Sequence, residues 1–248
     1  MSENLGQPVL VENRPGGDAL LGVRYVKSLP ADGYTLLAIS SAFAQSPALK
    51  LDPGYEVKDF VGVGGMNEAA LMMVTASSQP DTSLAQFLTR AKANPELLSY
   101  GSGGVGTTAW MAGALFMKQT DSKLLHVPYK GLAAAAPDVM AGRLNVIFDT
   151  AGSAGPNVKE GRLRALGVST SKRLAAFPDI PTIAEQGFPG FDVPTWVGLI
   201  APAGARGVVV HFGVAEMDES KEIYLVRFES GPDGLLGNPV GCLPEELT

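Results

Sequence analysis

The chain of 248 residues has one cysteine, Cys242, and only two histidines, His126 and His211. One cysteine excludes an intramolecular disulfide and a site built from paired cysteines, and two histidines do not by themselves define a metal site. Long apolar runs are absent, because the stretch AALMMV at 69–74 is far below the roughly 20 residues of a membrane helix. There is no run of Lys and Arg, and a net charge of -6 argues against the basic surface of a nucleic-acid binder.

Catalytic signatures are missing as well. The sequence contains no G-x-S-x-G, H-E-x-x-H or G-K-[ST], so no hydrolase elbow, zinc-protease helix or P-loop is predicted. His126 falls inside a predicted strand, where a hydrogen-bonded structural histidine is favoured over a general base. The acids at 216–222 lack EF-hand spacing, which favours a solvated face over a calcium site. We therefore expect no enzyme, no metal and no cofactor.

What is present is typical of a globular α/β protein, with 46% hydrophobic and 18% charged residues. Short apolar runs bounded by Gly, Pro and Asp alternate with helix-like segments, which predicts an α/β fold with a mostly parallel sheet. The predicted strands are 8–12, 34–40, 59–65, 70–76, 97–100, 124–129, 144–149, 164–169 and 196–201. This alternation breaks at 205–235.

Three helices have recognisable ends or faces. The first covers 18–29, with Asp18 as its N-cap and Pro30 as its stop. The second covers 81–94, where Ser83 and Gln86 form a capping box and Asn94 precedes a proline. The third covers 107–119 and is apolar almost all round, so we expect it to be well buried.

The segment GSGGVGTT at 101–108 raises the question of a ligand. Its glycines have the G-x-G-x-x-G spacing of a dinucleotide loop, but the strand that follows ends in Tyr-Lys and not in the acid that holds a ribose. Glycine amides, hydroxyls and a helix N-terminus still suit any anion, including a carboxylate. A tight turn with Thr107 as an ordinary N-cap is the equal alternative. The candidate residues are Ser102, Gly103, Gly104, Gly106, Thr107 and Thr108.

Three other loops follow predicted strands. Asp149 and Thr150 come directly after a buried-looking strand, where an acid can pair with a ligand amine or orient hydroxyls and water. The equal alternative is that Asp149 caps its own loop or the next helix. Two further sets also stand at the carboxyl ends of strands, namely Ser40 and Ser41, and Tyr129, Lys130 and Gly131. Their shared position predicts that these loops converge on one cleft.

Several phrases together resemble the Bug family of extracytoplasmic solute receptors, the substrate-binding proteins of tripartite tricarboxylate transporters. They are LGQPVLVENRPGGDALLG, LPADGYTLL, ANPELLSYGSGGVGTTAWMAG, HVPYKG, AGRLNVIFD, GRLRALGVSTSKR and FPDIPTIAEQGFPGFDVPTWVGLIAPAG, in unbroken order over about 3–204. The resemblance implies a monomeric periplasmic protein with a two-lobe, Venus flytrap fold. Such a receptor closes over a small carboxylate, passes it to a membrane permease and performs no chemistry.

By this resemblance, lobe 1 comprises 1–75 and returns at 197–248, and lobe 2 comprises 76–196. The crossings near 74–78 and 194–199 would form a hinge close to Trp196, although an ordinary core aromatic is favoured there. The GSGGVGTT loop, HVPYKG and the Asp149 loop match the lobe 2 side of the cleft, and Ser40 and Ser41 match the lobe 1 side.

The chain departs from the family pattern at both ends. It begins late in the pattern and without a signal peptide, so we expect an incomplete lobe 1, and a cytoplasmic location if this start is genuine. The segment 205–235 lacks the amphipathic helices expected there, so the tail 205–248 is divergent. Two alternatives stay open: an α/β enzyme that uses 101–108 for a phosphorylated cofactor, and a non-functional receptor remnant.

Overall fold

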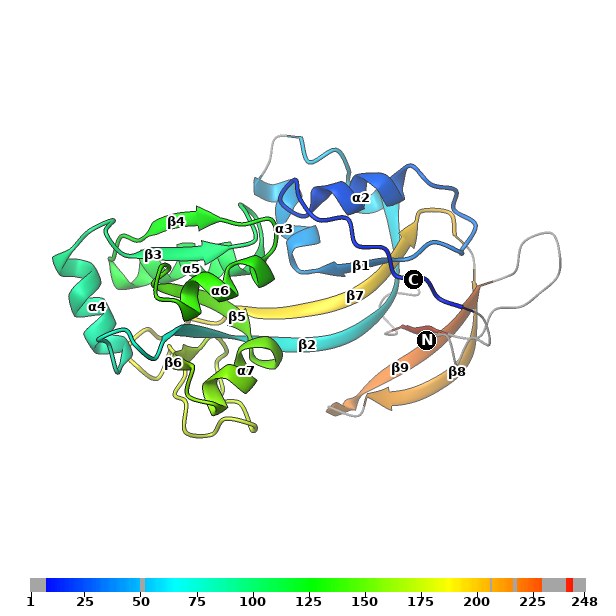
Figure 1. The fold of residues 1–248 in the computed structure, drawn as a ribbon. Coiled ribbons are helices and arrows are strands. Elements are labelled where there is room, and N and C mark those ends of the chain that lie inside the picture. The colour runs from blue at the N-terminus through cyan, green and yellow to red at the C-terminus, as the bar shows by residue number, and fades with distance from the viewer. Residues whose placement is uncertain (1–7, 50–51, 206, 216–217, 229–239, 243–248) are drawn as a thin grey trace. The chain divides into compact units, whose positions relative to one another are not determined.

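The structure is a computed structural model that describes residues 8–49, 52–205, 207–215, 218–228 and 240–242. These residues form two compact units (Figure 1). Unit 1 takes 20–67, the residues before 16 and those from 196 onward, and unit 2 takes 16–19 and 68–195. Two strands, β2 (Phe60–Ala76) and β7 (Pro194–Pro202), contain residues of both units.

Unit 1 is built around an aromatic cluster. Its elements are α2 (Leu20–Lys27), β1 (Leu37–Ser40), α3 (Ala42–Leu49), the short 3-10 helix η1 (Val57–Asp59) and the unit 1 parts of β2 and β7. The rings of Phe43 and Tyr55 stack at 5.0 Å, and Phe60 meets both edge-on. The Tyr55 hydroxyl donates to the carbonyl of Phe43 at 2.6 Å, which satisfies its polar end inside the core.

Unit 2 contains the remaining helices and the greater part of the sheet. After β2 come α4 (Leu84–Ala93), β3 (Ser99–Ser102), α5 (Thr108–Thr120), β4 (Leu125–Pro128), η2 (Leu132–Ala134), α6 (Ala136–Met140), β5 (Val146–Thr150), α7 (Ala151–Lys159) and β6 (Leu163–Val168). In this sheet β2 pairs with β5 and β6, and β3 pairs with β5 and β4.

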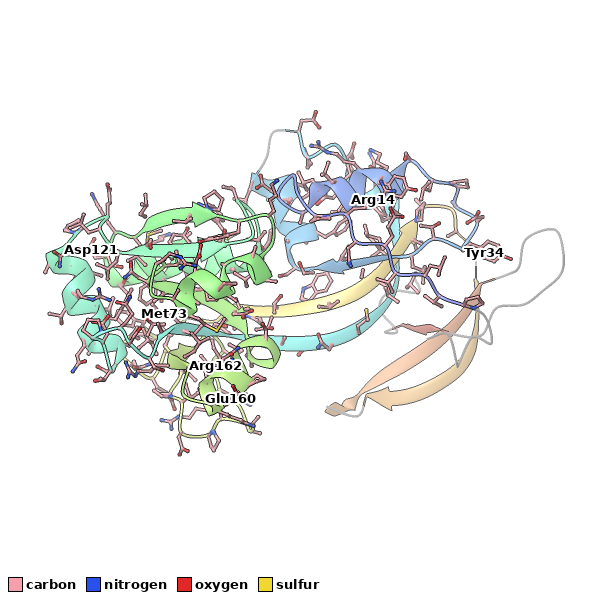
Figure 2. The ribbon with its side chains drawn as sticks, viewed as in Figure 1. Arg14, Tyr34, Met73, Asp121, Glu160 and Arg162 are labelled. Atoms are coloured by element: carbon pink, nitrogen blue, oxygen red, sulfur yellow. The ribbon has the colours of Figure 1, made fainter. Side chains whose placement is uncertain are left out.

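The sheet of unit 2 is buried on both faces. Side chains alternate along its strands, so Met73 of β2 (labelled in Figure 2) packs with α4 and α5, whereas Met72 packs with α6 and α7. Both methionines are fully buried. Helices on both faces explain why these strands read as continuous apolar runs rather than as an alternating pattern.

The prediction of a mostly parallel sheet is wrong, because the sheet is mixed. The pairs β3–β4 and β3–β5 are parallel, as expected for strands joined through helices. The pairs β1–β7, β2–β5 and β2–β6 are antiparallel. Every antiparallel pair in this sheet includes β2 or β7, the two strands that run through both units, so the direction of these strands is not set by a local strand–helix–strand unit.

Two strand predictions also need correction. The segment 8–12 is not a strand: Leu10 and Val11 are 92% and 84% exposed, and no strand among the described residues pairs with it. Strand propensity alone does not make a strand where no neighbouring strand pairs with the segment. The predicted strands 59–65 and 70–76 are one continuous strand, β2, whose residues 65–68 are exposed but still extended.

The helix predictions hold in unit 2 and fail in part in unit 1. Ser83 caps α4 as predicted and Asn94 ends it, but the Gln86 side chain accepts from the N–H of Thr82 rather than from that of Ser83. Helix α5 is well buried, with only Lys118 exposed. Asp18 is not the N-cap of α2, since its φ of 55° is left-handed and an N-cap has an extended backbone.

The tail after residue 205, where the predicted alternation of strands and helices breaks, contains three strands among its described residues. Strands β8 (Gly207–Ala215), β9 (Asp218–Phe228) and β10 (Val240–Cys242) form a separate antiparallel sheet in the order β10–β9–β8. The acidic side chains of 216–222 lie outside the described part of the chain.

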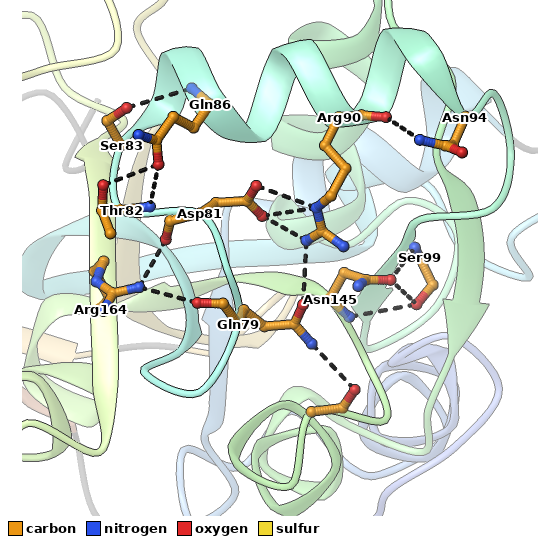
Figure 3. Close-up of polar contacts among 11 residues, drawn as sticks. Gln79, Asp81, Thr82, Ser83, Gln86, Arg90, Asn94, Ser99, Asn145 and Arg164 are labelled. Carbon is orange, nitrogen blue, oxygen red and sulfur yellow. Dashed lines mark hydrogen bonds and ion pairs between the residues drawn. The ribbon is translucent and has the colours of Figure 1, made fainter.

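A polar cluster fastens the loop between β2 and α4 (Figure 3). The Arg90 guanidinium pairs with the buried carboxylate of Asp81 and also donates to Gln79 at 3.1 Å. Arg164 of β6 donates to the carbonyls of Ser77, Gln79 and Asp81. These bonds satisfy backbone carbonyls that the loop itself leaves without partners.

Candidate ligand-binding site

All four predicted loops lie where a strand passes into a helix. Ser40 ends β1 and Ser41 precedes α3; residues 103–107 join β3 to α5; residues 129–131 join β4 to η2; and Asp149 and Thr150 end β5, directly before α7. Three of the junctions precede α-helices, α3, α5 and α7, whose N-terminal amides attract anions, and the fourth precedes only the three-residue 3-10 helix η2. The expectation that Asp149 opens a loop is wrong, because the residues after Thr150 are helical.

Within unit 2 the sheet register brings three of these junctions together. In the parallel pair β3–β4, Ser102 lies beside Pro128, and in β3–β5, Gly101 lies beside Ile147. The three strands therefore end side by side, and their loops leave from the same edge of the sheet. Ser40 and Ser41 belong to unit 1. Ser41 is buried and its carbonyl accepts from the N–H groups of Ala44 and Gln45.

The glycine loop is held by its own hydrogen bonds. The Gly104 N–H donates to Ser102 Oγ at 3.0 Å, and the Gly104 carbonyl accepts from Thr107 Oγ1 at 2.7 Å. Gly104 needs its glycine, because its φ is 116°. Gly103 lies close to the next loop, since a Cβ on it would be 3.5 Å from the Cα of Gly131. The loops after β3 and β4 are thus in backbone contact.

Thr107 caps α5, as the alternative reading of this loop predicted. Its Oγ1 accepts from the N–H of Trp110 at 3.4 Å while donating its proton to Gly104. Thr108 is buried and its Oγ1 lies 3.4 Å from that of Thr195. The capping hydroxyl supports the loop from inside, so main-chain amides are the donors best suited to meet an anion here.

His126 supports the same loop. This β4 residue places Nε2 2.7 Å from Ser102 Oγ, and its ring packs 4.9 Å from that of Tyr100. Burial lowers the pKa of His126, and the negative charge of Asp18 opposes that shift. The prediction of a hydrogen-bonded structural histidine is confirmed. Its pairing with Ser102 was not predicted, because only the parallel register shows that the residues are neighbours.

The loop after β4 carries one fixed and one exposed polar side chain. The Tyr129 hydroxyl donates to Asp138 Oδ2 at 2.8 Å, and Arg143 pairs with the other oxygen of that carboxylate. Burial, and then the bond to Asp138, raise the pKa of Tyr129. Lys130 is exposed. Lys130 therefore offers a positive charge at this edge of the sheet, beside the tyrosine that Asp138 holds in place.

Asp149 is a buried acid, 8% exposed. Burial raises the pKa of Asp149, while hydrogen bonds from Ser153 and from the Thr150 N–H, the latter 2.8 Å long, oppose the shift. Thr150 caps α7 by accepting from the N–H of Ser153 at 3.3 Å. No Lys, Arg or His in the described part of the chain pairs with Asp149. A ligand ammonium or hydroxyl is the kind of group that such a carboxylate accepts.

Three other features bear on function. No cluster of three or more potential metal-ligating side chains occurs among the described residues. No helix in the same residues is long and apolar enough to span a membrane. Trp196 is 37% exposed and is not the core aromatic that the sequence favoured.

Comparison with known proteins identifies relatives along most of the chain. A protein of Pseudomonas sp. (strain P51), described as a UPF0065 protein in the tcbD-tcbE intergenic region, is 36% identical over 222 residues. These cover 89% of this chain and 66% of that protein. Protein BugT of Bordetella pertussis is 32% identical over 245 residues, or 96% of this chain and 75% of BugT. The chain thus spans about two thirds of the length of the first of these relatives.

Solved structures of the same kind share the fold. The periplasmic binding protein BugD superimposes with a TM-score of 0.79 at 28% identity, covering 82% of this chain and 68% of BugD. Rhodopseudomonas palustris Rpa4515 with adipate gives 0.78 at 32% identity, covering 82% and 69%. MatC from the same organism, with bound malate, gives 0.78 at 27%, covering 82% and 70%. The predicted α/β fold of two-lobe periplasmic binding proteins is confirmed.

The family model described as the tripartite tricarboxylate transporter family receptor matches residues 1–218. That span includes every candidate site residue and every element from α2 to β7. This chain belongs to the family of tripartite tricarboxylate transporter receptors.

Proposed function

We propose that this protein is the solute receptor of a tripartite tricarboxylate-type transporter and binds a small organic carboxylate between its lobes. The observation that carries the proposal is the convergence of three strand-to-helix junctions at one edge of unit 2, with the glycine loop among them. The structures of Rpa4515 with adipate and MatC with malate support it, since both relatives hold small dicarboxylates.

In this proposal the amides of the glycine loop and of the first turn of α5 hold the ligand carboxylate. Helix N-termini favour a negative charge through their unpaired N–H groups and the helix dipole. Lys130 adds a positive charge, and Asp149 accepts a hydrogen bond from a ligand hydroxyl or amine. Ser102 and Thr107 support the loop through their hydroxyl groups. The backbone of the remaining candidate residues would approach the ligand closely, namely Gly103, Gly104, Gly106 and Thr108. Ser40 and Ser41 supply the opposite side from lobe 1.

Ligand binding would be coupled to lobe closure, with no catalytic step. The two lobes would correspond to units 1 and 2, and the chain would cross between them within β2 and β7. A ligand that touches both lobes stabilises the closed state by its differential affinity. The closed receptor would work as a monomer in the periplasm and deliver its ligand to the membrane permease subunits of the transporter.

A melting curve with a panel of small carboxylates tests this function, with NAD and ATP as controls for the nucleotide alternative. A ligand at about 100 times its Kd adds roughly 2.7 kcal/mol of stability. For a chain of this size each kcal/mol raises the midpoint by about 2–4 °C. We expect malate, adipate or a related acid to raise the midpoint by several degrees and the nucleotides to leave it unchanged. A shift with nucleotides alone would refute the receptor function.

A further inference from the structure

The glycine loop of unit 2 already has a carboxylate against it. A Cβ built on Gly104 would lie only 2.2 Å from Asp18 Oδ1 and 3.1 Å from its Cγ. The carboxylate of Asp18 therefore occupies the space beside the bare Cα of Gly104, and a side chain at 104 would have to displace it. Asp18 belongs to the segment 16–19, which groups with unit 2 although the residues on both sides of it group with unit 1.

The backbone of this segment is strained. Asp18 and Ala19 are consecutive residues with left-handed φ angles of 55° and 68°. A Cβ makes this conformation unfavourable, and Ala19 has no polar side chain to compensate. Such strain persists only where the surroundings hold the segment in place. The close contact between Asp18 and Gly104 is one contact that holds it.

The charge of Asp18 also acts on the loop. It lies close enough to His126 to oppose the effect of burial on that imidazole, and His126 is bonded to Ser102 at the start of the loop. Gly104 precedes the first residue of α5 by four positions, at the end of the helix where a negative charge is favoured. An internal carboxylate thus lies in the environment that would attract the carboxylate of a ligand.

We propose that Asp18 is an internal competitor for the glycine loop, an autoinhibitory contact that a ligand carboxylate must displace. This inference rests on the proposed function, because it takes the same loop as the carboxylate site. Two like charges cannot share the loop without repulsion, so binding requires the Asp18 carboxylate to leave. Its departure lets 18 and 19 relax from the left-handed region. Asp18 thereby sets the threshold concentration at which the receptor fills.

The test compares wild type with Asp18→Asn and with Asp179→Asn as the matched control. Asparagine keeps the shape of aspartate and tolerates a left-handed backbone, so only the charge is removed. Asp179 is an exposed acid of the same unit, and its substitution makes the same change in net charge. Titration calorimetry of the full chain with malate and with adipate measures the affinities. Hydrogen exchange of the amides at 102–108 without ligand reports whether the loop is covered.

We expect Asp18→Asn to bind the better of the two acids about tenfold more tightly than wild type. This change corresponds to a competitor that leaves the loop free in about one molecule in ten, which weakens the apparent affinity about tenfold. The loop amides should also exchange faster in this variant, and Asp179→Asn should match wild type in both measurements. Equal affinity in all three proteins would overturn the competitor while leaving the receptor function in place. Absence of binding to either acid in all three would count against both.

Discussion

Replacement of Thr107 by valine tests how the glycine loop is organised. The two side chains have nearly the same shape, so the change removes a hydroxyl with little change in packing. That hydroxyl accepts from the Trp110 N–H and donates to the Gly104 carbonyl at 2.7 Å. The substitution therefore removes the N-cap of α5 and a bond that closes the loop onto the helix.

The magnitude follows from the two bonds. Loss of a Ser or Thr N-cap costs about 0.5–2 kcal/mol. The Gly104 carbonyl keeps the Thr107 N–H at 3.3 Å and lies 3.2 Å from the Ser102 hydroxyl, so loss of its second bond adds little. We expect a loss near 1–2 kcal/mol, which lowers the melting midpoint by about 2–8 °C for a chain of this size. Carboxylate affinity should fall as well, because the first-turn amides of α5 lose their fixed orientation.

Two further variants make the measurement specific. Thr107→Ser retains the hydroxyl and should restore both the midpoint and the affinity. Thr89→Val makes the same chemical change on the exposed face of α4, where Oγ1 donates to the Ala85 carbonyl within the helix, and it should leave both nearly unchanged. Thermal melts and calorimetric titration with malate or adipate give the two readouts. If Thr107→Val melts with wild type and binds equally well, the capping hydroxyl has no part in organising this loop.

Three other variants test the surroundings of the site. Burial raises the pKa of Asp149, so the native state holds this proton more tightly than the unfolded state does. Wild type therefore loses stability as the pH rises from the ordinary aspartate pKa through the raised one. In urea unfolding, Asp149→Asn should be more stable than wild type at neutral pH, and this difference should disappear toward about pH 4. Gly113→Ala should destabilise the protein by about 1–2 kcal/mol in the same assay, despite the higher helix propensity of alanine. The reason is that the new Cβ would lie 2.3 Å from the buried Tyr100 ring. A stabilised variant would refute the packing of α5 on β3. Arg90→Met leaves the buried Asp81 carboxylate unpaired and should lower the free energy of unfolding by about 3 kcal/mol. A second substitution, Asp81→Leu, should recover much of that loss. If it recovers none, the ion pair itself stabilises the fold.

The sequence was sufficient wherever the determinants are local. Ser83, Asn94 and Thr107 mark helix ends through bonds that span only a few residues, and all three act as predicted. The strand-to-helix junctions were predictable because apolar runs followed by small polar residues change period at those points. These local signals were enough to select the candidate loops before any register was known.

Non-local pairing accounts for most of what could not be predicted. The run 8–12 has strand propensity, but no strand among the described residues pairs with it. The sequence predicts two separate strands at 59–65 and 70–76, although β2 continues between them. The contact of His126 with Ser102 depends on the register of two parallel strands. The position of Asp18 depends on a left-handed backbone that its sequence does not favour. The sequence pattern around Asp18 is the same for a helix N-cap and for the proposed competitor, so only the fold distinguishes the two roles.

The internal bonds of the glycine loop also bear on selectivity. Ser102 and Thr107 donate their hydroxyl protons within the protein. If the glycine loop binds a ligand carboxylate as proposed, it would therefore do so mainly through main-chain amides. Amides recognise a carboxylate without regard to the rest of the molecule, so this loop should accept many organic acids alike. Discrimination then falls to the side chains around it, of which Lys130 favours a second negative group and Asp149 a hydrogen-bond donor. An acid carrying both, as a hydroxydicarboxylate does, satisfies the two side chains together, whereas a plain dicarboxylate leaves Asp149 without a partner from the ligand.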